Sequence, residues 1–210
     1  MENKYVAFTF DDGPVPYAED CTALRIMRTL QEYGQQATFF YVGQNINEES
    51  GKELLFAKSI GCEAGNHTFT HCFLTEKTKE EITEELTKTA AAIKAVLGEE
   101  PVLMRLPYLA TNETVSATVP YPMIQCSVDS KDWAGVSKEE IMKNVLDAEA
   151  AGELENAVVL MHAQYETTAN AVSELLPMLM EKGYRFVTVS ELAKKNGIVL
   201  EPHKLYGKLV

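Results

Sequence analysis

The 210-residue sequence predicts an α/β fold: a single domain built as a distorted (β/α) barrel with about seven parallel strands. Three observations support this prediction. Short apolar runs alternate with longer segments of helical periodicity, as in βαβ units. About seven such runs favour a closed barrel over an open sheet, and polar clusters follow several of them. No linker precedes Gly197, so we expect one domain over residues 1–197 and a C-terminal tail over 198–210.

The strands are expected, in chain order, at residues 5–10, 37–42, near 63, 102–105, 123–128, 157–161 and 185–189. The helices are expected at 19–33, 48–60, 79–97, 138–151 and 168–182, followed by a short closing helix. Helix ends are indicated by Gly34, Gly61 and Gly98, because glycine readily takes the left-handed conformation found there. Ser137 followed by Glu140 resembles a capping box, and Ser190 is expected to cap the closing helix.

The composition limits the classes of partner. The formal net charge is −12, and an acidic surface repels phosphate backbones and anionic membrane surfaces. No apolar run approaches the roughly 18 residues that a membrane span needs, and the N-terminus does not resemble a signal peptide. A neutral substrate, or a cation held by carboxylates, fits the charge better.

The cysteines do not indicate a thiolate metal site. Cys21, Cys62, Cys72 and Cys126 are far apart, and none forms a CxxC pair. We expect them to be buried free thiols.

His67 and His71 are two of only four histidines and lie four residues apart. On a helical turn this spacing places both imidazoles on one face, where they could bind one metal ion. The residue after His67 is threonine, so this is not the HExxH motif of zinc peptidases. The alternative is an ordinary pair of surface or core histidines.

Asp11 and Asp12 are adjacent within TFDDGP, where the first strand should end. One carboxylate could bind a cation while the other acts as a general base. The alternative is simple turn chemistry, because Asp-Gly and Gly-Pro are common in turns.

Three further clusters lie at the C-terminal ends of predicted strands. In parallel α/β folds this edge of the sheet carries the active site. Arg105 could orient a carboxylate by bidentate hydrogen bonds, or form a purely structural ion pair. Asp129, Asp132 and Trp133 could belong to a site, or be solvated acids beside a core tryptophan. His162 could be a general acid beside an aspartate, or a satisfied core histidine.

Taken in order, these stretches resemble the polysaccharide deacetylase family, which is the NodB-homology domain or carbohydrate esterase family four. Its motifs TFDDGP, H(S/T)xxH, RxPY, DxxDW and LxH correspond here to five segments that cover nearly the whole chain. They are Thr9–Pro14, His67–His71, Arg105–Tyr108, Asp129–Trp133 and Leu160–His162.

The resemblance implies a function: metal-dependent removal of acetyl groups from carbohydrate polymers or oligomers, with release of acetate. It assigns one divalent metal ion, usually zinc with cobalt or nickel tolerated, to Asp12, His67 and His71. The implied catalytic residues are Asp11 as base, Arg105 holding Asp11, the backbone N–H of Tyr108 at the oxyanion, His162 as acid, and Asp132 tuning His162. The implied substrate-binding residues are Trp133 and Leu160 around the acetyl methyl group, and Pro107.

The sequence departs from the family pattern at two positions. Leu109 stands where many members have glycine, and Ala163 stands where many have aspartate after the last-motif histidine. Both changes concern the substrate groove more than catalysis. With short connections between motifs, we expect an open, shallow groove that accepts sugars inside a chain.

The overall pattern is similar to deacetylase domains of xylan-degrading enzymes, which favours acetylated xylan and chito-oligosaccharides as substrates. The alternatives are a peptidoglycan N-acetylglucosamine deacetylase, a small-molecule metallo-amidase, or a catalytically weak carbohydrate-binding relative. We expect a monomer from an extracellular or cell-surface bacterial enzyme, present here as a domain excised from a longer chain.

Overall fold

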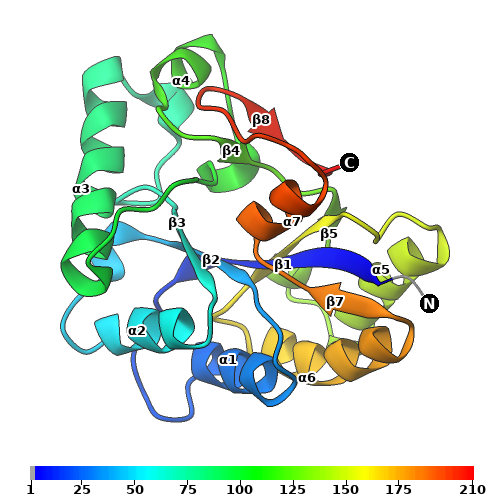
Figure 1. The fold of residues 1–210 in the computed structure, drawn as a ribbon. Helices are drawn as coiled ribbons and strands as arrows, with labels where there is room; N and C mark the ends of the chain where they lie inside the picture. The colour runs from blue at the N-terminus through cyan, green and yellow to red at the C-terminus, as the bar shows by residue number, and fades with distance from the viewer. Residues whose placement is uncertain (1–2) are drawn as a thin grey trace.

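A computed structural model describes residues 3–210 as an α/β fold in which strands and helices alternate along the chain (Figure 1). The strands are β1 (Lys4–Gly13), β2 (Thr38–Tyr41), β3 (Glu63–Asn66), β4 (Met123–Ile124), β5 (Val128–Asp129), β6 (Val158–His162), β7 (Tyr184–Phe186) and β8 (Leu205–Tyr206). The α-helices are α1 (Thr22–Glu32), α2 (Gly51–Ser59), α3 (Lys79–Leu97), α4 (Glu113–Thr118), α5 (Lys138–Ala150), α6 (Glu166–Glu181) and α7 (Val189–Lys195). Short 3-10 turns are η1 (Gly43–Asn45), η2 (Leu74–Glu76), η3 (Pro107–Leu109) and η4 (Asp132–Ala134).

The strands form a curved parallel sheet in the order β3-β2-β1-β6-β5. The long central strand β1 pairs with β7 along its first residues and with β2 along its last. Single bridges from Met104 to Asn66 and to Met123 connect β3 to the two-stranded pair β4-β8. The carboxyl ends of these parallel strands therefore meet on one rim of a distorted barrel.

Alternation along β1 separates two apolar layers. Val6, Phe8 and Phe10 belong to the main core, which lies between the sheet and helices such as α1 and α6 (Figure 1). Ala7 points to the opposite face, where it joins Val158 in a second cluster. Because side chains alternate with period two, Thr9 and Asp11 follow Ala7 on the inner face. The barrel interior is thus apolar at one end and polar at the rim.

Helix α7 covers the apolar end of the barrel interior. Its residues Val189, Leu192 and Ala193 pack in the cluster that contains Ala7 and Val158. The helix begins at Thr188, whose hydroxyl accepts the backbone N–H of Glu191. The prediction that Ser190 caps this helix was therefore wrong, and the strand before it ends at Phe186 rather than at residue 189.

Two other predicted strands are shorter in the structure. The segment 102–105 contributes only the isolated bridges of Met104, and the segment 123–128 is divided into β4 and β5. Helix α3 spans the predicted residues and ends at the left-handed Gly98. Ser137 accepts the N–H of Glu140 as expected, and a complete capping box is found at Thr78 with Glu81.

The segment after Gly197, predicted as a C-terminal tail, lies against the barrel. Strand β8 pairs with β4 through Met123–Leu205 and Ile124–Tyr206, and Leu209 is buried in the inner cluster. Within the part of the chain that the structure describes, no helix is both long and apolar enough to cross a bilayer.

A buried carboxyl group supports the loop that leaves β1. Glu53 of α2 is fully buried, and its Oε2 accepts the backbone N–H of Val15 at 2.9 Å. A Cβ placed on Gly13 would lie 3.1 Å from the Tyr41 ring and 3.2 Å from Glu53 Oε1, so glycine permits this close packing. Burial raises the pKa of Glu53 to about 8, although the bond from Val15 opposes the shift.

We expect Glu53→Gln to change how stability depends on pH. Between its ordinary pKa of 4.5 and about 8, Glu53 holds a proton in the folded chain that it releases on unfolding. The free energy of unfolding of the wild type should therefore fall as pH rises through this window, by an amount on the order of a few kcal/mol. Glu53→Gln should lose less stability over the same window. Urea denaturation in metal-free buffer at pH 5 and pH 8 measures the difference.

The exposed carboxyl of Glu49 provides the matched control, because Glu49→Gln should keep the wild-type dependence on pH. An identical loss of stability in wild type and Glu53→Gln would show that Glu53 is not protonated in the folded protein.

Candidate functional site

Asp11 and Asp12 lie at the end of β1, at the barrel rim. In a regular strand their side chains would point to opposite faces. The β1–β2 register shifts between Phe10 and Gly13, and Asp12 has a left-handed φ of 68°. This irregularity brings both carboxylates toward His67, whose Nε2 lies 3.7 Å from Asp11 Oδ2 and 3.3 Å from Asp12 Oδ1.

His67 and His71 come together on a loop after β3 rather than on a helical turn. Thr68 and His71 have left-handed φ angles of 64° and 57°, which fold the loop back on itself. Glu85 of α3 holds this loop, because its Oε2 accepts the backbone N–H groups of Phe69 and Thr70, each at 2.8 Å. The imidazole rings are then 4.9 Å apart, centroid to centroid.

The arrangement of Asp12, His67 and His71 fits a metal ion. Their ligand atoms all lie within 4.8 Å of one another. The Nδ1–H of His67 donates to the carbonyl of Arg105 at 2.8 Å, so its Nε2 presents a lone pair. His71 Nε2 lies 3.1 Å from Asp12 Oδ1, a buried oxygen with no hydrogen-bond partner in the described residues. Two imidazole nitrogens and one carboxylate oxygen therefore converge, a donor set that suits a divalent metal ion.

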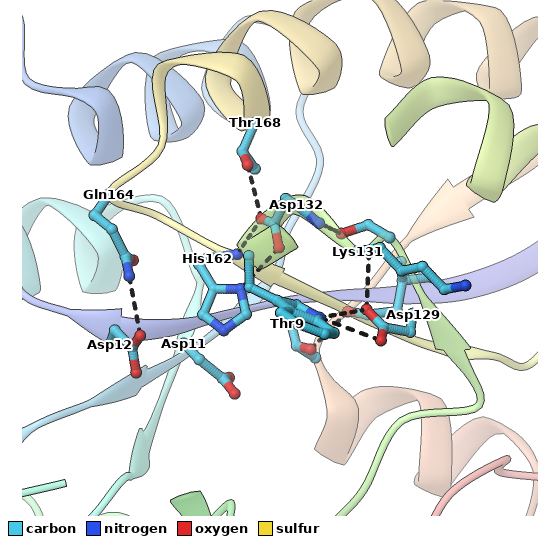
Figure 2. Close-up of polar contacts among 12 residues, drawn as sticks. Thr9, Asp11, Asp12, Asp129, Lys131, Asp132, His162, Gln164 and Thr168 are labelled. Carbon is cyan, nitrogen blue, oxygen red and sulfur yellow. Dashed lines mark hydrogen bonds and ion pairs between the residues drawn. The ribbon is translucent and has the colours of Figure 1, made fainter. Parts of the chain in front are cut away.

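The electrostatics of Asp12 agree with this arrangement. Burial acts to raise the pKa of Asp12, but its contacts with His67 and His71 outweigh burial and hold that pKa well below the ordinary value. Its second oxygen, Oδ2, accepts a hydrogen bond from Gln164 Nε2 at 2.9 Å (Figure 2). One carboxylate oxygen is therefore anchored by the protein, while the other is directed to the imidazoles.

Asp11 is held by the fully buried guanidinium of Arg105. The Nη1 group donates to Asp11 Oδ1 at 2.8 Å and to Thr9 Oγ1 at 2.6 Å. The remaining donors bond the carbonyls of Ile124 and Gln125, at 3.0 and 3.1 Å. Only one oxygen of Asp11 takes part in this ion pair, so the other is free to face the site.

His162 lies beside Asp11, since the two residues are paired across β1 and β6. Its Nδ1–H donates to Asp132 Oδ1 at 2.8 Å, and its backbone N–H donates to Oδ2 at 2.7 Å. Thr168 donates a further hydrogen bond to Asp132, as Figure 2 shows. This pairing fixes the tautomer of His162 and leaves Nε2 available.

Two opposing effects set the pKa of His162. Burial acts to lower it, but the hydrogen bond to Asp132 and the negative charges of Asp11, Asp132 and Asp12 raise it above the ordinary value. The imidazole is thus biased toward the protonated form, as a proton donor requires.

The predicted residues line or support a single cavity of about 430 Å³. The lining residues are Asp11, Asp12, His67, His71, Leu106, Tyr108, Leu109, Asp129, Trp133, Leu160, His162 and Tyr165. Arg105 and Asp132 are buried and form ion pairs with Asp11 and His162, respectively. Trp133 is 55% exposed, which excludes a core position, whereas Pro107 is buried within η3 and is not among the lining residues.

Sequence analysis missed several supporting residues. Gln164 is only two residues after His162, but its partner, Asp12, is 152 residues away along the chain. Thr9 stands within TFDDGP without a predicted role, and its partners Arg105 and Val159 are 96 and 150 residues away along the chain. Glu85 and Thr168 are ordinary polar residues whose partners are 15 or 16 and 36 residues away. No local pattern indicates such contacts.

A (β/α) barrel with an Asp-His-His cluster, a buried Asp-Arg pair and an Asp-paired histidine at its rim has the components of a metal-dependent hydrolase. The family model described as "Polysaccharide deacetylase" matches residues 1–121. The chain belongs to the polysaccharide deacetylase family, as the relatives and solved structures also indicate.

The chain is 35% identical over 192 residues to the peptidoglycan-N-acetylglucosamine deacetylase PgdA of Listeria monocytogenes, covering 90% of this chain and 39% of that protein. It is 32% identical over 201 residues to a bifunctional xylanase/deacetylase of Pseudobutyrivibrio xylanivorans, covering 94% and 32%. It therefore spans less than half the length of either relative.

Among solved structures, the Xyl-CE4 domain of a multidomain xylanase from the hindgut metagenome of Trinervitermes trinervoides aligns with a TM-score of 0.89 and 31% identity, covering 99% of this chain and 98% of that one. A family 4 acetyl xylan esterase from Clostridium thermocellum, in complex with a cobalt ion, aligns with a TM-score of 0.89 and 27% identity, covering 98% and 99%.

We expect Asp132→Asn to lower the pKa of His162, because it removes the charged acceptor at Nδ1. An NMR titration of the imidazole, with the protein at constant ionic strength, measures the shift. Thr168→Val is the matched control: it removes a hydroxyl from the same carboxylate but keeps the charge, so its effect should be smaller. A pKa of His162 that is unchanged in Asp132→Asn would contradict this account.

Proposed function

We propose that the chain is a metal-dependent deacetylase that hydrolyses acetyl groups on carbohydrate polymers or oligomers and releases acetate. One observation carries the proposal. A single cavity contains the Asp12-His67-His71 cluster together with Asp11 and His162, two proton-transfer groups with different partners. The matching family and the printed activities of its members support it.

We assign one divalent ion to Asp12, His67 and His71, and propose zinc, with cobalt or nickel also active. One carboxylate and two imidazoles are donors that suit zinc. The cobalt ion in the Clostridium thermocellum esterase supports a divalent ion in this fold. Such an ion supplies a Lewis acid that activates water and polarises the acetyl carbonyl.

The protein residues move two protons. Asp11 accepts a proton from the attacking water through the oxygen that Arg105 leaves free. Water adds to the acetyl carbon, the bond from that carbon to the sugar oxygen or nitrogen breaks, and acetate leaves. His162 donates the second proton from Nε2 to the departing oxygen or nitrogen, while Asp132 stabilises the imidazolium.

The remaining residues orient the substrate. We assign the backbone N–H of Tyr108 to the developing oxyanion, where a fixed donor is most effective. Leu160 and Trp133 line the cavity and would contact the acetyl methyl group. Pro107 is buried before Tyr108 and would act by shaping that turn.

We propose neutral acetylated glycans, namely acetylated xylan and N-acetylglucosamine oligosaccharides, as substrates in preference to peptidoglycan. The charged side chains that line the cavity are Asp11, Asp12, Asp129 and the histidines, with no lysine or arginine from the described residues. Anionic groups such as the carboxylate of muramic acid would be repelled there. Because these polymers lie outside cells, we propose an extracellular or cell-surface location. We also propose that the catalytic domain is monomeric.

Removal of the ion should abolish activity. Acetate release from acetylxylan and N-acetylchito-oligosaccharides should fall to background after treatment with a chelator, and return when zinc or cobalt is added back. Peptidoglycan is included as the third substrate to test the preference. Activity that survives complete metal removal, verified by elemental analysis, would refute the proposed mechanism.

Asp11→Asn should keep the ion and lose turnover. The amide retains the shape of the carboxylate but accepts a proton poorly, so kcat should fall by about 10²- to 10⁴-fold. Metal content measured on the same sample separates catalysis from ion binding. Gln164→Ala, which removes a bond to Asp12 and leaves Asp11 intact, should instead weaken metal affinity. Full activity of Asp11→Asn would exclude Asp11 as the base.

A further inference from the structure

Two stacked aromatic rings lie beside the metal-binding histidines. The rings of Phe73 and Tyr108 are 3.9 Å apart, centroid to centroid, and nearly parallel at 13°. Tyr108 also meets the His71 ring edge-on at 4.8 Å. Both aromatic side chains are solvent-exposed, Phe73 by 42% and Tyr108 by 57%. The pair therefore stabilises little of the core, although it is placed next to the reaction centre.

The backbone that presents Tyr108 is held in a costly conformation. Tyr108 and Leu109 both have left-handed φ angles, 58° and 55°. For residues with a side chain this conformation is sterically unfavourable. Strained backbone of this kind persists where neighbouring contacts fix it, commonly at functional sites. Here two backbone hydrogen bonds close the turn, from the Leu109 N–H to the Leu106 carbonyl at 3.0 Å and from the Ala110 N–H to the Pro107 carbonyl at 3.2 Å, and the Tyr108 ring projects from it onto Phe73.

A second exposed aromatic side chain, that of Trp133, lies at the opposite edge of the sheet. Trp133 follows β5, whereas His67 and His71 follow β3, and these two strands end the path β3-β2-β1-β6-β5. Trp133 is fixed by its indole N–H, which lies 3.3 Å from each oxygen of Asp129. Tyr108 and Trp133 line the same cavity. The site is thus flanked by aromatic groups from two different strand ends.

The chemistry of this surface favours a sugar ring. The face of an aromatic ring carries negative potential and attracts the polarised C–H groups on the apolar face of a pyranose. Uncharged sugars also suit a cavity whose charged lining is acidic.

We propose that Phe73 and Tyr108 form a sugar-binding platform, on which the pyranose next to the acetylated residue of a neutral glycan stacks. Phe73 is then a specificity-determining residue that selects chains over single sugars. This inference rests on the proposed deacetylase function and specifies a subsite of that same site.

Phe73→Ala tests the platform. We expect KM for a pentasaccharide to rise by about 3- to 10-fold, the range that corresponds to the loss of one aromatic contact. The substrate is N-acetylchitopentaose or acetylated xylopentaose, whichever the wild type hydrolyses faster. The rate on 4-nitrophenyl acetate, which is too small to reach a neighbouring subsite, should remain within about twofold of wild type. Phe73→Trp should retain the wild-type KM because it keeps a flat ring.

Tyr33→Ala is the matched control. Tyr33 is also an exposed aromatic residue, but it lies at the end of α1, and within the described residues no aromatic contact joins it to Tyr108 or to the histidines, unlike Phe73. Its removal should leave both substrates unaffected.

The other outcomes distinguish failure of the platform from failure of the proposed function. An unchanged KM for the pentasaccharide in Phe73→Ala would overturn the platform and leave the deacetylase function standing. An equal loss on the pentasaccharide and on 4-nitrophenyl acetate would mean that Phe73 only supports the Tyr108 turn. If the wild type releases no acetate, the proposed function fails, and the platform is tested by titrating the zinc-loaded protein with N-acetylchitopentaose and following Trp133 fluorescence. Equal affinity of wild type and Phe73→Ala in that titration would overturn it.

Discussion

The site depends on one buried guanidinium group. Arg105 is fully enclosed, and burying an unpaired cation would be strongly unfavourable. Its charge is balanced by Asp11, its other donors bond backbone carbonyls and Thr9, and its face lies 4.4 Å from the centre of the Phe40 ring. Its own carbonyl accepts the Nδ1–H of His67. A single residue therefore orients the proposed base and, through its backbone, one of the proposed metal ligands.

A second buried ion pair, between Asp132 of η4 and His162 of β6, holds the proposed acid in the same way. Asp132 is 1% exposed and balances His162 as Arg105 balances Asp11. Because Asp11 and His162 are paired across β1 and β6, the roughly 4.8 Å spacing of adjacent strands sets the distance between their backbones. The sheet thus keeps the proposed base and the proposed acid close, while separate buried partners, Arg105 and Asp132, hold them. The rigidity of the barrel, rather than that of the loops, determines this geometry.

Local patterns were sufficient to predict much of the fold. Helix α3 has strong apolar periodicity and a glycine stop, and its predicted and observed bounds agree. The segment 102–105 looked like a strand but contributes only the bridges of Met104, because its pairing depends on Asn66 and Met123 from distant parts of the chain. The strand propensity of a segment cannot reveal which distant residues it pairs with. The same limitation explains why Arg105 and Asp132 were recognised from motifs, whereas the bond from Arg105 to Thr9 and the bond from Thr168 to Asp132 were not foreseen.

The irregular end of β1 determines where insertions and deletions in the sequence would disturb the site. Asp11 continues the inner face of the strand after Ala7 and Thr9, whereas Asp12 reaches the histidines only through its left-handed turn. Inserting or deleting one residue before Asp11 would turn the inner face outward and disrupt core and site together. Changes after Gly13 would leave that register intact. The loop that follows can therefore vary in length and sequence, while the position of the two carboxylates stays tied to the packing of the barrel itself.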